Sequence, residues 1–322
     1  MRAIRFDEYG DPEVLKLAEV PAPEPKAGEV LVKVDHVGIN YGETLHRKGK
    51  YQDGAPPPAI PGMECSGTVA KLGDGVTEFA VGQRVAAMTK ETYAEYAISR
   101  VGRTLALPDG VDFARGAALP IQGLTAYYLL FGMDTTTPDK TVLVHSAAGG
   151  TGLMCVQMAK LAGAKVIGTV SSEAKAKTVL EAGADHAINY TENDFAAAAM
   201  RLTGGRGVDY ILDSIGRDTV EKGLGVLAPL GHLCMYGFAS GTVKQVNPML
   251  LFRKTLKLSG MIMGRVMENH PLSGEGVARM WRWVAEGKLK VAVDGVWPLA
   301  EAAEAHRAME SRETSGKLLL KV

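Results

Sequence analysis

A glycine-rich turn between a β-branched run and an apolar helix constrains the fold more than any other segment. The run Val142–His145 ends in residues 146–152, which read SAAGGTG, and an apolar-periodic stretch follows at Leu153–Leu161. A strand, a glycine turn and a helix in this order form the pyrophosphate site of a dinucleotide-binding unit. Gly149 lets the backbone approach phosphates, and Gly152 lets helix and strand pack closely, although an ordinary tight loop remains the alternative.

Strands and helices continue to alternate after this turn. The pattern predicts strands at Lys165–Val170, His186–Tyr190, Val208–Asp213, His232–Tyr236 and Leu256–Met263, and helices at Glu173–Ala182, Asp194–Leu202 and Thr219–Leu227. Strands that alternate with helices of about ten residues form a parallel sheet with right-handed crossovers, covered on both faces. We therefore predict an α/β fold with a Rossmann domain, a doubly wound parallel sheet, at residues 123–261.

The end of the second strand indicates which dinucleotide is bound. Domains that prefer NAD usually place Asp or Glu there, to hold the ribose 2′-hydroxyl. This chain has Ser171 and Ser172, with Lys175 just beyond. Two hydroxyls and an ammonium suit a 2′-phosphate, so we expect NADPH. Glu173 is the competing candidate, but a carboxylate in the first turn of a helix also complements the helix dipole.

Composition excludes several classes of function. Lys and Arg together number 36, as do Asp and Glu, and no basic block stands out. Affinity for nucleic acid or anionic membranes needs clustered basic residues, so we expect neither partner. Long apolar runs and a signal segment are lacking, and the three cysteines are far apart in the sequence. We expect a soluble, cytoplasmic protein in which Cys155 and Cys234 are buried thiols.

The flanks of the predicted Rossmann domain have a different character. Residues 1–122 are rich in glycine, proline and β-branched residues, with strands predicted at Glu29–Val37, Glu64–Leu72 and Gln83–Ala87. This pattern predicts an irregular, mostly antiparallel β-barrel. Residues 262–322 should form two helices, the second at Glu301–Arg312, and a last strand at Gly316–Val322. We expect this segment to complete the N-terminal domain, with a cofactor cleft between the two domains.

Seven motifs carry a resemblance to a known family. They are Val37–Thr44 (VGINYGET), Pro61–Glu64 (PGME), Gln122–Leu130 (QGLTAYYLL), Ala147–Gly152 (AAGGTG), Gly168–Ser172 (GTVSS), Ile188–Tyr190 (INY) and Asp213–Thr219 (DSIGRDT). Over nearly its full length, the chain resembles a zinc-independent medium-chain dehydrogenase/reductase of the quinone oxidoreductase, or zeta-crystallin-like, type. The order of the motifs is specific for the family, and less so for the substrate.

The resemblance implies a domain arrangement and an assembly. The Rossmann domain would be inserted in a GroES-like, mostly antiparallel β-barrel catalytic domain built from 1–122 and 262–322. It also implies bound NADPH, and a homodimer formed by pairing the last Rossmann strands of two copies. The apolar segment Leu256–Met263 fits that pairing, since an apolar edge strand is otherwise an aggregation hazard.

The resemblance also assigns site residues. The expected catalytic residues are Asn40, which the resemblance assigns, Glu43, which departs from the family aspartate, and Tyr51, which like Tyr41 is a candidate aromatic contact or proton donor for the acceptor. Asn40 would lie near the nicotinamide and Thr125 beneath its ring. The remaining expected contacts line the pyrophosphate, the adenosine phosphate, the groove and the C-terminal return of the chain: Gly149, Gly150, Thr151, Ser171, Ser172, Lys175, Tyr190, Ser214, Phe238 and Arg312. A buried structural tyrosine is an equal alternative for Tyr51, and a hydrogen-bonded structural carboxylate is favoured for Glu64.

Zinc chemistry is the main alternative within the superfamily. Zinc-dependent alcohol dehydrogenases have Cys where this chain has Asn40, and His where it has Met63. Neither an amide nor a thioether is a usual zinc ligand, so we expect no catalytic metal. Without a Lewis acid, reduction of an electrophilic conjugated acceptor is easier than oxidation of an alcohol. The sequence therefore favours an NADPH:quinone oxidoreductase.

Some residues depart from the family pattern and leave the acceptor open. Glu43 replaces the usual aspartate, and Leu45 and Gly260 stand where bacterial quinone reductases have Tyr and Arg. An NADPH-dependent reductase of enones or 2-enoyl thioesters is therefore a close second. A non-catalytic structural or RNA-binding role, known for zeta-crystallin-like proteins, is the alternative from another class. Neutral charge gives no support to RNA binding.

Overall fold

Two compact units make up the chain. The computed structural model describes residues 1–51, 54–269 and 273–322. Unit 1 consists of Met1–Ile121 and Val291–Val322, and unit 2 consists of Gln122–Lys290. The first boundary lies next to the one predicted from sequence. Residues 262–290, which we expected to complete the catalytic domain, group with unit 2 instead.

Unit 2 contains the predicted doubly wound parallel sheet. Its strands are β8 (Thr141–Val144), β9 (Lys165–Val170), β10 (His186–Asn189), β11 (Val208–Asp213), β12 (Leu227–Met235) and β13 (Lys257–Gly260). All pairs are parallel, in the order β10-β9-β8-β11-β12-β13. The chain moves outward from β8 in one direction and then restarts at β11 in the other, as in doubly wound folds. The α/β prediction is confirmed.

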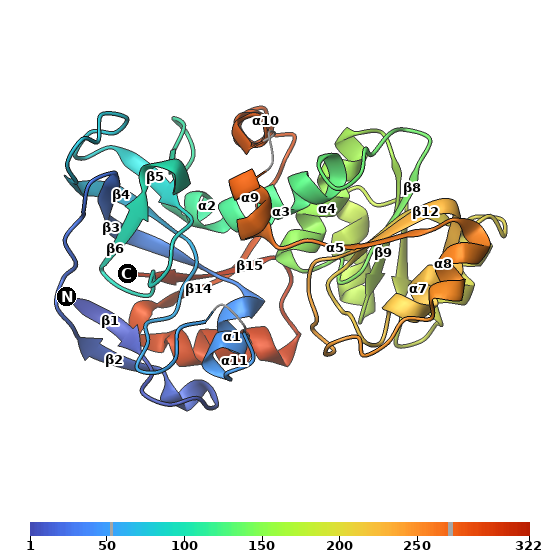
Figure 1. Cartoon of the computed structure of the whole chain (residues 1–322), viewed down its shortest axis with the longest axis horizontal. Helices are drawn as coiled ribbons and strands as arrows, with labels where there is room; N and C mark the ends of the chain where they lie inside the picture. The colour runs from blue at the N-terminus through green and yellow to red at the C-terminus, as the bar shows by residue number, and fades with distance from the viewer. Residues whose placement is uncertain (52–53, 270–272) are drawn as a thin grey trace. The chain divides into compact units, whose positions relative to one another are not determined.

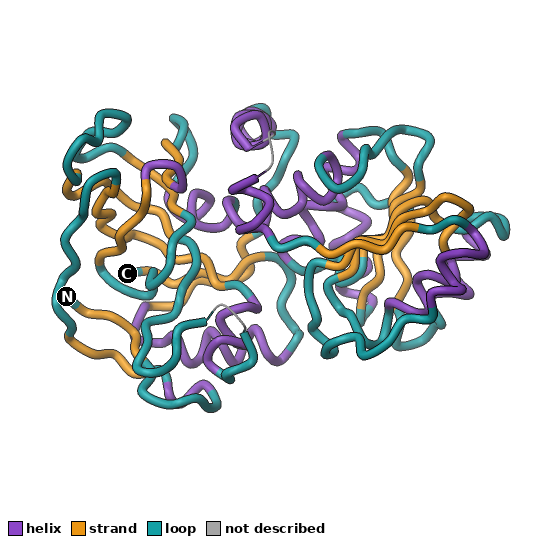
Figure 2. Tube along the Cα trace, viewed as in Figure 1, coloured by secondary structure: helices purple, strands orange, loops and turns teal. Residues whose placement is uncertain are grey.

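Helices cover both faces of this sheet (Figures 1 and 2). On one face lie α3 (Pro120–Phe131), α4 (Gly150–Leu161) and α5 (Glu173–Glu181), and on the other lie α6 (Phe195–Leu202), α7 (Val220–Val226) and α8 (Pro248–Lys254). Strand residues facing the second set, such as Leu143, Ile167 and Ile211, form one buried cluster with α6 and α7. Burial on both faces explains why these strands are nearly continuous apolar runs.

Two elements of unit 2 differ from the sequence prediction. We expected a helix to Leu227 and then a strand from His232, but β12 begins at Leu227. Its pairing with β11 skips from Leu227 to His232, and Leu230 between them has a positive φ of 66°. Pro229 lacks an N–H for a ladder, so this stretch is an irregularity within the strand. Helix α8, capped by the Asn247 side chain, was not predicted.

Aromatic packing explains why residues 262–290 belong to unit 2. Helix α9 (Met263–Asn269) precedes α10 (Ser273–Ala285) in this segment. Trp283 of α10 lies 6.5 Å from Tyr127 and 6.2 Å from Phe131, both on α3, between ring centroids. The Arg279 guanidinium lies 5.2 Å above the Phe131 ring. The amphipathic pattern of α10 therefore reflects burial against α3. None of the described helices has the length and apolar character needed to span a bilayer.

Unit 1 is built on a mixed sheet that joins the two ends of the sequence. Its strand order is β14-β15-β3-β4-β5-β7, with β6 also paired to β3. The bounds are β3 (Glu29–Ile39), β4 (Cys65–Leu72), β5 (Arg84–Ala87), β6 (Tyr96–Arg100), β7 (Thr104–Ala106), β14 (Val293–Pro298) and β15 (Lys317–Lys321). The pairing of β15 with β3 is antiparallel, and the red and blue strands lie together in Figure 1. The last strand of the sequence therefore lies in the same sheet as β3.

Smaller elements complete unit 1. A separate hairpin pairs β1 (Arg2–Arg5) with β2 (Lys16–Glu19). Helices α1 (Tyr41–Arg47) and α2 (Phe113–Ala118) were not predicted, nor was β14, which runs parallel to β15. The predicted C-terminal helix is α11 (Ala302–Ser311). A core of β-branched and aromatic side chains, including Val30, Val32 and Tyr93, lies between the sheet and α11.

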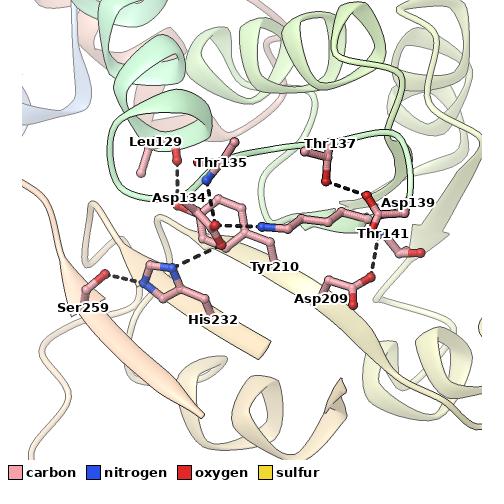
Figure 3. A network of polar contacts seen from close by, with 11 residues as sticks. Leu129, Asp134, Thr135, Thr137, Asp139, Thr141, Asp209, Tyr210, His232 and Ser259 are labelled. Carbon is pink, nitrogen blue, oxygen red and sulfur yellow. Dashed lines mark hydrogen bonds and ion pairs between the residues drawn. The ribbon is translucent and has the colours of Figure 1, made fainter. Parts of the chain in front are cut away.

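A polar network fastens the segment between α3 and β8 to the sheet (Figure 3). Asp134 accepts from Lys140 Nζ at 2.7 Å, and its Oδ2 lies 3.4 Å from His232 Nδ1 on β12. The other His232 nitrogen lies 2.7 Å from Ser259 Oγ on β13. Burial opposes ionisation of Asp134, but hydrogen bonds from His232 and Lys140 outweigh it and hold its pKa well below the usual range. Because Thr141 begins β8, this network lies at the end of the sheet opposite the glycine turn, and we interpret it as structural.

Close packing at Gly152 gives a test of the glycine turn. A Cβ at Gly152 would lie 2.3 Å from the Ser146 carbonyl oxygen and 2.8 Å from Ala147 backbone atoms, which cannot yield like a side chain tip. Gly152→Ala should therefore destabilise the protein by about 1–3 kcal/mol. Gly225→Ala is the matched control, since Gly225 is also helical but faces open space. It should be neutral or stabilise by up to about 1 kcal/mol. Urea midpoints measure both, and equal effects would contradict the packing argument.

Candidate functional site

The carboxyl ends of five adjacent strands bring most of the expected cofactor residues of unit 2 to one edge of the sheet. They follow β8, β9, β10, β11 and β12 in turn: Gly149, Gly150, Thr151, Ser171, Ser172, Lys175, Tyr190, Ser214 and Phe238. Ligands of doubly wound sheets bind at this edge, beside the point where the strand order reverses. That reversal lies between β8 and β11, and the glycine turn follows β8 directly.

The glycine turn has the geometry of a phosphate site. Gly149 caps the N-terminus of α4, so the first N–H groups of this twelve-residue helix lack helical acceptors. A Cβ at Gly150 would lie 2.2 Å from the Gln122 side-chain amide. Gln122 is therefore packed against the turn. The sequence analysis did not select Gln122, although it stands three residues before Thr125, which is nearly buried on α3.

A second helix begins beside the turn, after β9. Ser172 caps α5, and its hydroxyl accepts from the Lys175 backbone N–H at 3.3 Å. The competing acid, Glu173, accepts a hydrogen bond from the Asn189 side chain at 3.3 Å. This arrangement gives the Glu173 carboxylate a partner within the protein. Two hydroxyls, a helix N-terminus and the Lys175 side chain also lie at this position, and all of these groups attract anions.

Two loops lie side by side after β11 and β12. The buried Asp213 carboxylate accepts from the backbone N–H groups of Ile215 and Gly216 at 2.7 and 2.9 Å. It thereby fixes the turn that carries Ser214. The Ala239 N–H donates to the Ser214 carbonyl at 3.0 Å, so the loop of Phe238 is tied to the same turn. Phe238 and Tyr190 remain about half exposed, with flat faces available for a ligand.

In unit 1, Asn40 and Glu43 lie at the N-terminus of α1 and contact each other. Asn40 caps the helix. Its backbone N–H donates to Glu43 Oε2 at 2.8 Å, and its side-chain Nδ2 donates to Glu43 Oε1 at 3.3 Å. A glutamate at the third helical position commonly binds the cap residue in this way. Both carboxylate oxygens of Glu43, which replaces the aspartate expected at this position, thus accept hydrogen bonds from the cap residue.

A fully buried ion pair completes this cluster. Lys317, on β15, places Nζ 2.5 Å from Glu64 Oε1 and 2.7 Å from Asn40 Oδ1. Glu64 Oε1 also accepts from Asn40 Nδ2 at 3.0 Å, and Oε2 accepts from the Ile121 N–H at 2.8 Å. The carboxylate packs against β3 at Gly38. A Cβ at this position would lie only 2.7 Å from Glu64 Oε1, so the glycine leaves room for it. Glu64 is thus a buried, hydrogen-bonded carboxylate, and its partner Lys317 was not selected from the sequence.

Burial changes the acidity of Glu43. Loss of solvent raises the pKa of Glu43 to about 7, with a smaller contribution from the nearby Glu64 carboxylate. The Lys317 ammonium acts in the opposite direction but does not compensate. The cluster can hold or release one proton at Glu43.

Contacts at both ends hold α1 in place. The fully buried Arg47 donates to the Gly10 carbonyl at 2.7 Å and pairs with Glu310 of α11. Near the start of the helix, a Cβ at Gly42 would lie 2.9 Å from the Met63 methyl and 3.4 Å from the Tyr51 ring. Tyr51, an expected catalytic residue, therefore packs over α1 close to Met63. Arg312 ends α11 as an exposed residue with a left-handed φ of 60°.

Comparisons with known proteins agree with these features. The family model described as "Zinc-binding dehydrogenase" matches residues 150–282, and the model described as "Alcohol dehydrogenase GroES-like domain" matches residues 26–138. Quinone oxidoreductase 1 of Escherichia coli is 37% identical over 326 aligned positions, covering 98% of each chain. The 2-haloacrylate reductase of a Burkholderia species is 36% identical, covering 97% of this chain and 96% of the relative.

A solved structure also matches the whole chain. It is Escherichia coli quinone oxidoreductase complexed with NADPH, which has a TM-score of 0.95 at 36% identity and covers 100% of both chains. The match extends over the cluster at Asn40 and over the glycine turn.

The residues present do not fit the zinc ion that one family description names. Asn40 and Met63 offer an amide and a thioether at the positions where zinc-dependent enzymes have ligands. The Asn40 and Glu64 oxygens already face the Lys317 ammonium, which would repel a second cation. Within 1–51, 54–269 and 273–322, no group of three or more His, Cys, Asp or Glu side chains is placed to hold a metal ion.

The acidity of Glu43 predicts a pH dependence of stability. Between its ordinary pKa of 4.5 and the raised value of about 7, the folded protein holds a proton that the unfolded chain has released. Stability therefore falls as pH rises through this window, by about 2–3 kcal/mol between pH 5 and pH 8. Glu43→Gln should lack this loss, so its urea midpoint relative to wild type should rise from pH 5 to pH 8. Glu19→Gln, at an exposed carboxyl of β2, is the control, and parallel pH curves for Glu43→Gln and wild type would contradict the assignment.

Proposed function

Because this chain belongs to the quinone oxidoreductase group of the medium-chain dehydrogenase/reductase family, we propose that it is an NADPH:quinone oxidoreductase that works without a metal. NADPH and a proton reduce a quinone to a hydroquinone, and NADP⁺ is released. The observation that carries the proposal is full-length similarity to quinone oxidoreductases, together with a glycine turn suited to the cofactor's pyrophosphate.

The residues described above fit NADPH. The N-terminus of α4, with Gly149, Gly150 and Thr151, would bind the pyrophosphate through backbone N–H groups. The 2′-phosphate would be held by Ser171, Ser172 and Lys175, at the N-terminus of α5. Tyr190, Phe238, Ser214 and Thr125 would line the remainder of the cofactor, and Asn40 and Arg312 would contact it from unit 1. When bound, NADPH supplies the hydride.

The chain's own residues have three tasks in this reaction. They orient the cofactor, hold the acceptor against its reactive carbon, and exclude water. A quinone is already electrophilic, so it needs no Lewis acid. Glu43, buried and with a pKa of about 7, can hold a proton at its carboxyl group close to Asn40. Tyr51, packed beside Met63 over α1, is the proposed aromatic contact of the acceptor.

A second candidate function has one specific observation in its favour. The relative named 2-haloacrylate reductase is almost as similar to this chain as the quinone oxidoreductases are. A 2-haloacrylate carries a carbon–carbon double bond conjugated to a carboxylate, so its reduction needs the same hydride geometry. The departures from the family pattern expected at Leu45 and Gly260 also leave the identity of the acceptor open. We therefore retain reduction of enones or 2-enoyl thioesters as the alternative.

The proposal includes a cytoplasmic homodimer. Within the described residues β13 pairs with β12 alone, so its other edge is available to a second copy. Helix α8 packs against β12, and its Phe252 and Met249 are exposed. An apolar patch beside an open strand edge is typical of a subunit interface. Pairing of two β13 strands would continue the sheet across a two-fold axis.

A substrate panel tests the proposed reaction. Steady-state rates of NADPH oxidation should be compared for several quinones, enones and a crotonyl thioester under the same conditions. We expect quinones to give the highest kcat/KM. Faster turnover of the enone or thioester substrates, with quinones near background, would replace the quinone assignment with the alternative.

The cofactor preference predicts the effect of one lysine. Lys175→Ala should weaken NADPH binding by roughly ten- to a hundredfold, because a hydrogen bond to a charged group contributes about 1.5–3 kcal/mol. NADH, which lacks the 2′-phosphate, should be affected little. Lys177→Ala is the control, since Lys177 is on the same helix but exposed, near Glu181. Titration by fluorescence measures each Kd, and equal losses for NADH and NADPH would show that Lys175 does not read the phosphate.

A further inference from the structure

Lys317 connects the C-terminal part of unit 1 to the amide of Asn40. Its Nζ lies 2.7 Å from Asn40 Oδ1, and Glu64 Oε1 lies on the other side of the ammonium at 2.5 Å. Lys317, Glu43 and Glu64 are buried, whereas Asn40 is partly exposed. Asn40 is therefore the member of this cluster that faces outward, and the other three act on its inner side.

The charges around Asn40 permit one orientation of its amide. Nδ2 donates its two hydrogens to Glu43 Oε1 and Glu64 Oε1, and Oδ1 accepts from Lys317. Rotation of the amide by 180° would turn the oxygen toward two carboxyl groups and the NH₂ group toward an ammonium. The contacts with Glu64 and Lys317 would then be repulsive whether or not Glu43 holds a proton, and each would replace a charge-assisted hydrogen bond. Lys317 and the two acids thus fix the positions of the oxygen and the nitrogen of the Asn40 amide.

This orientation decides what Asn40 can bind. Both Nδ2 hydrogens are used inside the protein, so the amide has no N–H for a ligand. Oδ1 keeps a second lone pair, which receives no hydrogen bond from the described part of the chain. Quinone oxygens are acceptors and cannot pair with another acceptor. The carboxamide NH₂ of the nicotinamide ring is a donor and matches it.

We propose that Lys317 is a positioning residue, which holds the Asn40 amide as a hydrogen-bond acceptor for the carboxamide of NADPH. The inference rests on the proposed function, because it takes NADPH as the cofactor. It gives Asn40 a role in orienting the nicotinamide and none in polarising the quinone. The Lys317 ammonium donates to Asn40 Oδ1 and thereby fixes the orientation of the amide. This role explains why a buried ammonium is present in the cluster.

Binding measurements on a double-mutant cycle test this inference. The variants are Lys317→Met, Asn40→Leu and the double variant, with Lys321→Met as control. Lys321 is on the same strand but pairs with Asp35 at the surface. The probes are NADPH and adenosine 2′,5′-bisphosphate, which keeps the phosphorylated adenosine and lacks the nicotinamide. Each Kd is measured by fluorescence or calorimetry.

Specific outcomes follow if Lys317 acts through Asn40. Each single variant should weaken NADPH by roughly three- to tenfold, the value of one hydrogen bond between neutral groups. Adenosine 2′,5′-bisphosphate should bind all variants as it binds wild type. The double variant should lose no more NADPH affinity than Asn40→Leu alone, because the two changes remove the same contact. Losses that multiply, or unchanged NADPH binding by Lys317→Met, would overturn the inference.

A charge-balanced variant covers the case in which Lys317→Met does not fold. Lys317→Met combined with Glu64→Gln removes both charges of the buried pair. The amide introduced at position 64 can pair with Asn40 in either orientation, so NADPH affinity should remain reduced by roughly three- to tenfold. Recovery of wild-type affinity would show that Lys317 only balances the charge of Glu64, and would overturn the positioning role.

Failure of the proposed function gives a different result. Wild-type protein that binds NADPH but reduces none of the quinones would contradict the proposed reaction. The role of Lys317 would still be decided by the NADPH binding measurements. Wild-type protein that does not bind NADPH would overturn the proposed function directly, and the inference with it. Variant effects are read only against a wild type that binds.

Discussion

A buried lysine needs an anion beside it, and much of unit 1 is arranged to meet this requirement. Lys317 and Glu64 are 253 residues apart in the sequence and fully buried together. Leaving one member of such a pair without its partner typically costs about 3–5 kcal/mol. The pair therefore fixes β15 against β3 and β4, and places the start of α1 at the same point. Gly38 contributes by leaving room for the carboxylate.

The two units supply different kinds of interaction. Unit 2 offers backbone groups, because the glycine turn and the starts of α4 and α5 present N–H groups where the strands end. Such groups hold phosphates in almost any sequence that keeps the turn. Unit 1 offers side chains whose hydrogen-bonding roles are set by buried charges.

Unit 2 was more predictable than unit 1 for a physical reason. Its strands and helices are local patterns, and β9 and β11 have the bounds expected from sequence. The glycine turn also carries its own signature. Missed elements are those fixed by distant contacts, such as α1, held by Arg47 and Glu310, and the irregular start of β12, which depends on its pairing with β11.

The candidate site shows the same limit. Most expected cofactor residues of unit 2 followed from strand ends and family motifs. Lys317 did not, because a lysine at the start of the run Leu318-Leu319-Leu320 has the appearance of a solvated strand end. Its burial depends on a carboxylate that is distant in sequence. An acid just before an apolar strand, as Glu64 is, was the available sign that a buried cation exists elsewhere.

The place of β15 in the sheet also has a consequence for biosynthesis. Strand β3 leaves the ribosome long before its neighbour, so the nascent chain carries an unpaired strand edge while all of unit 2 is translated. Unit 2 is contiguous and can fold first, whereas unit 1 cannot be completed before residues 291–322 are made. The exposed edge of β3 is therefore most open to incorrect association while unit 2 is being translated.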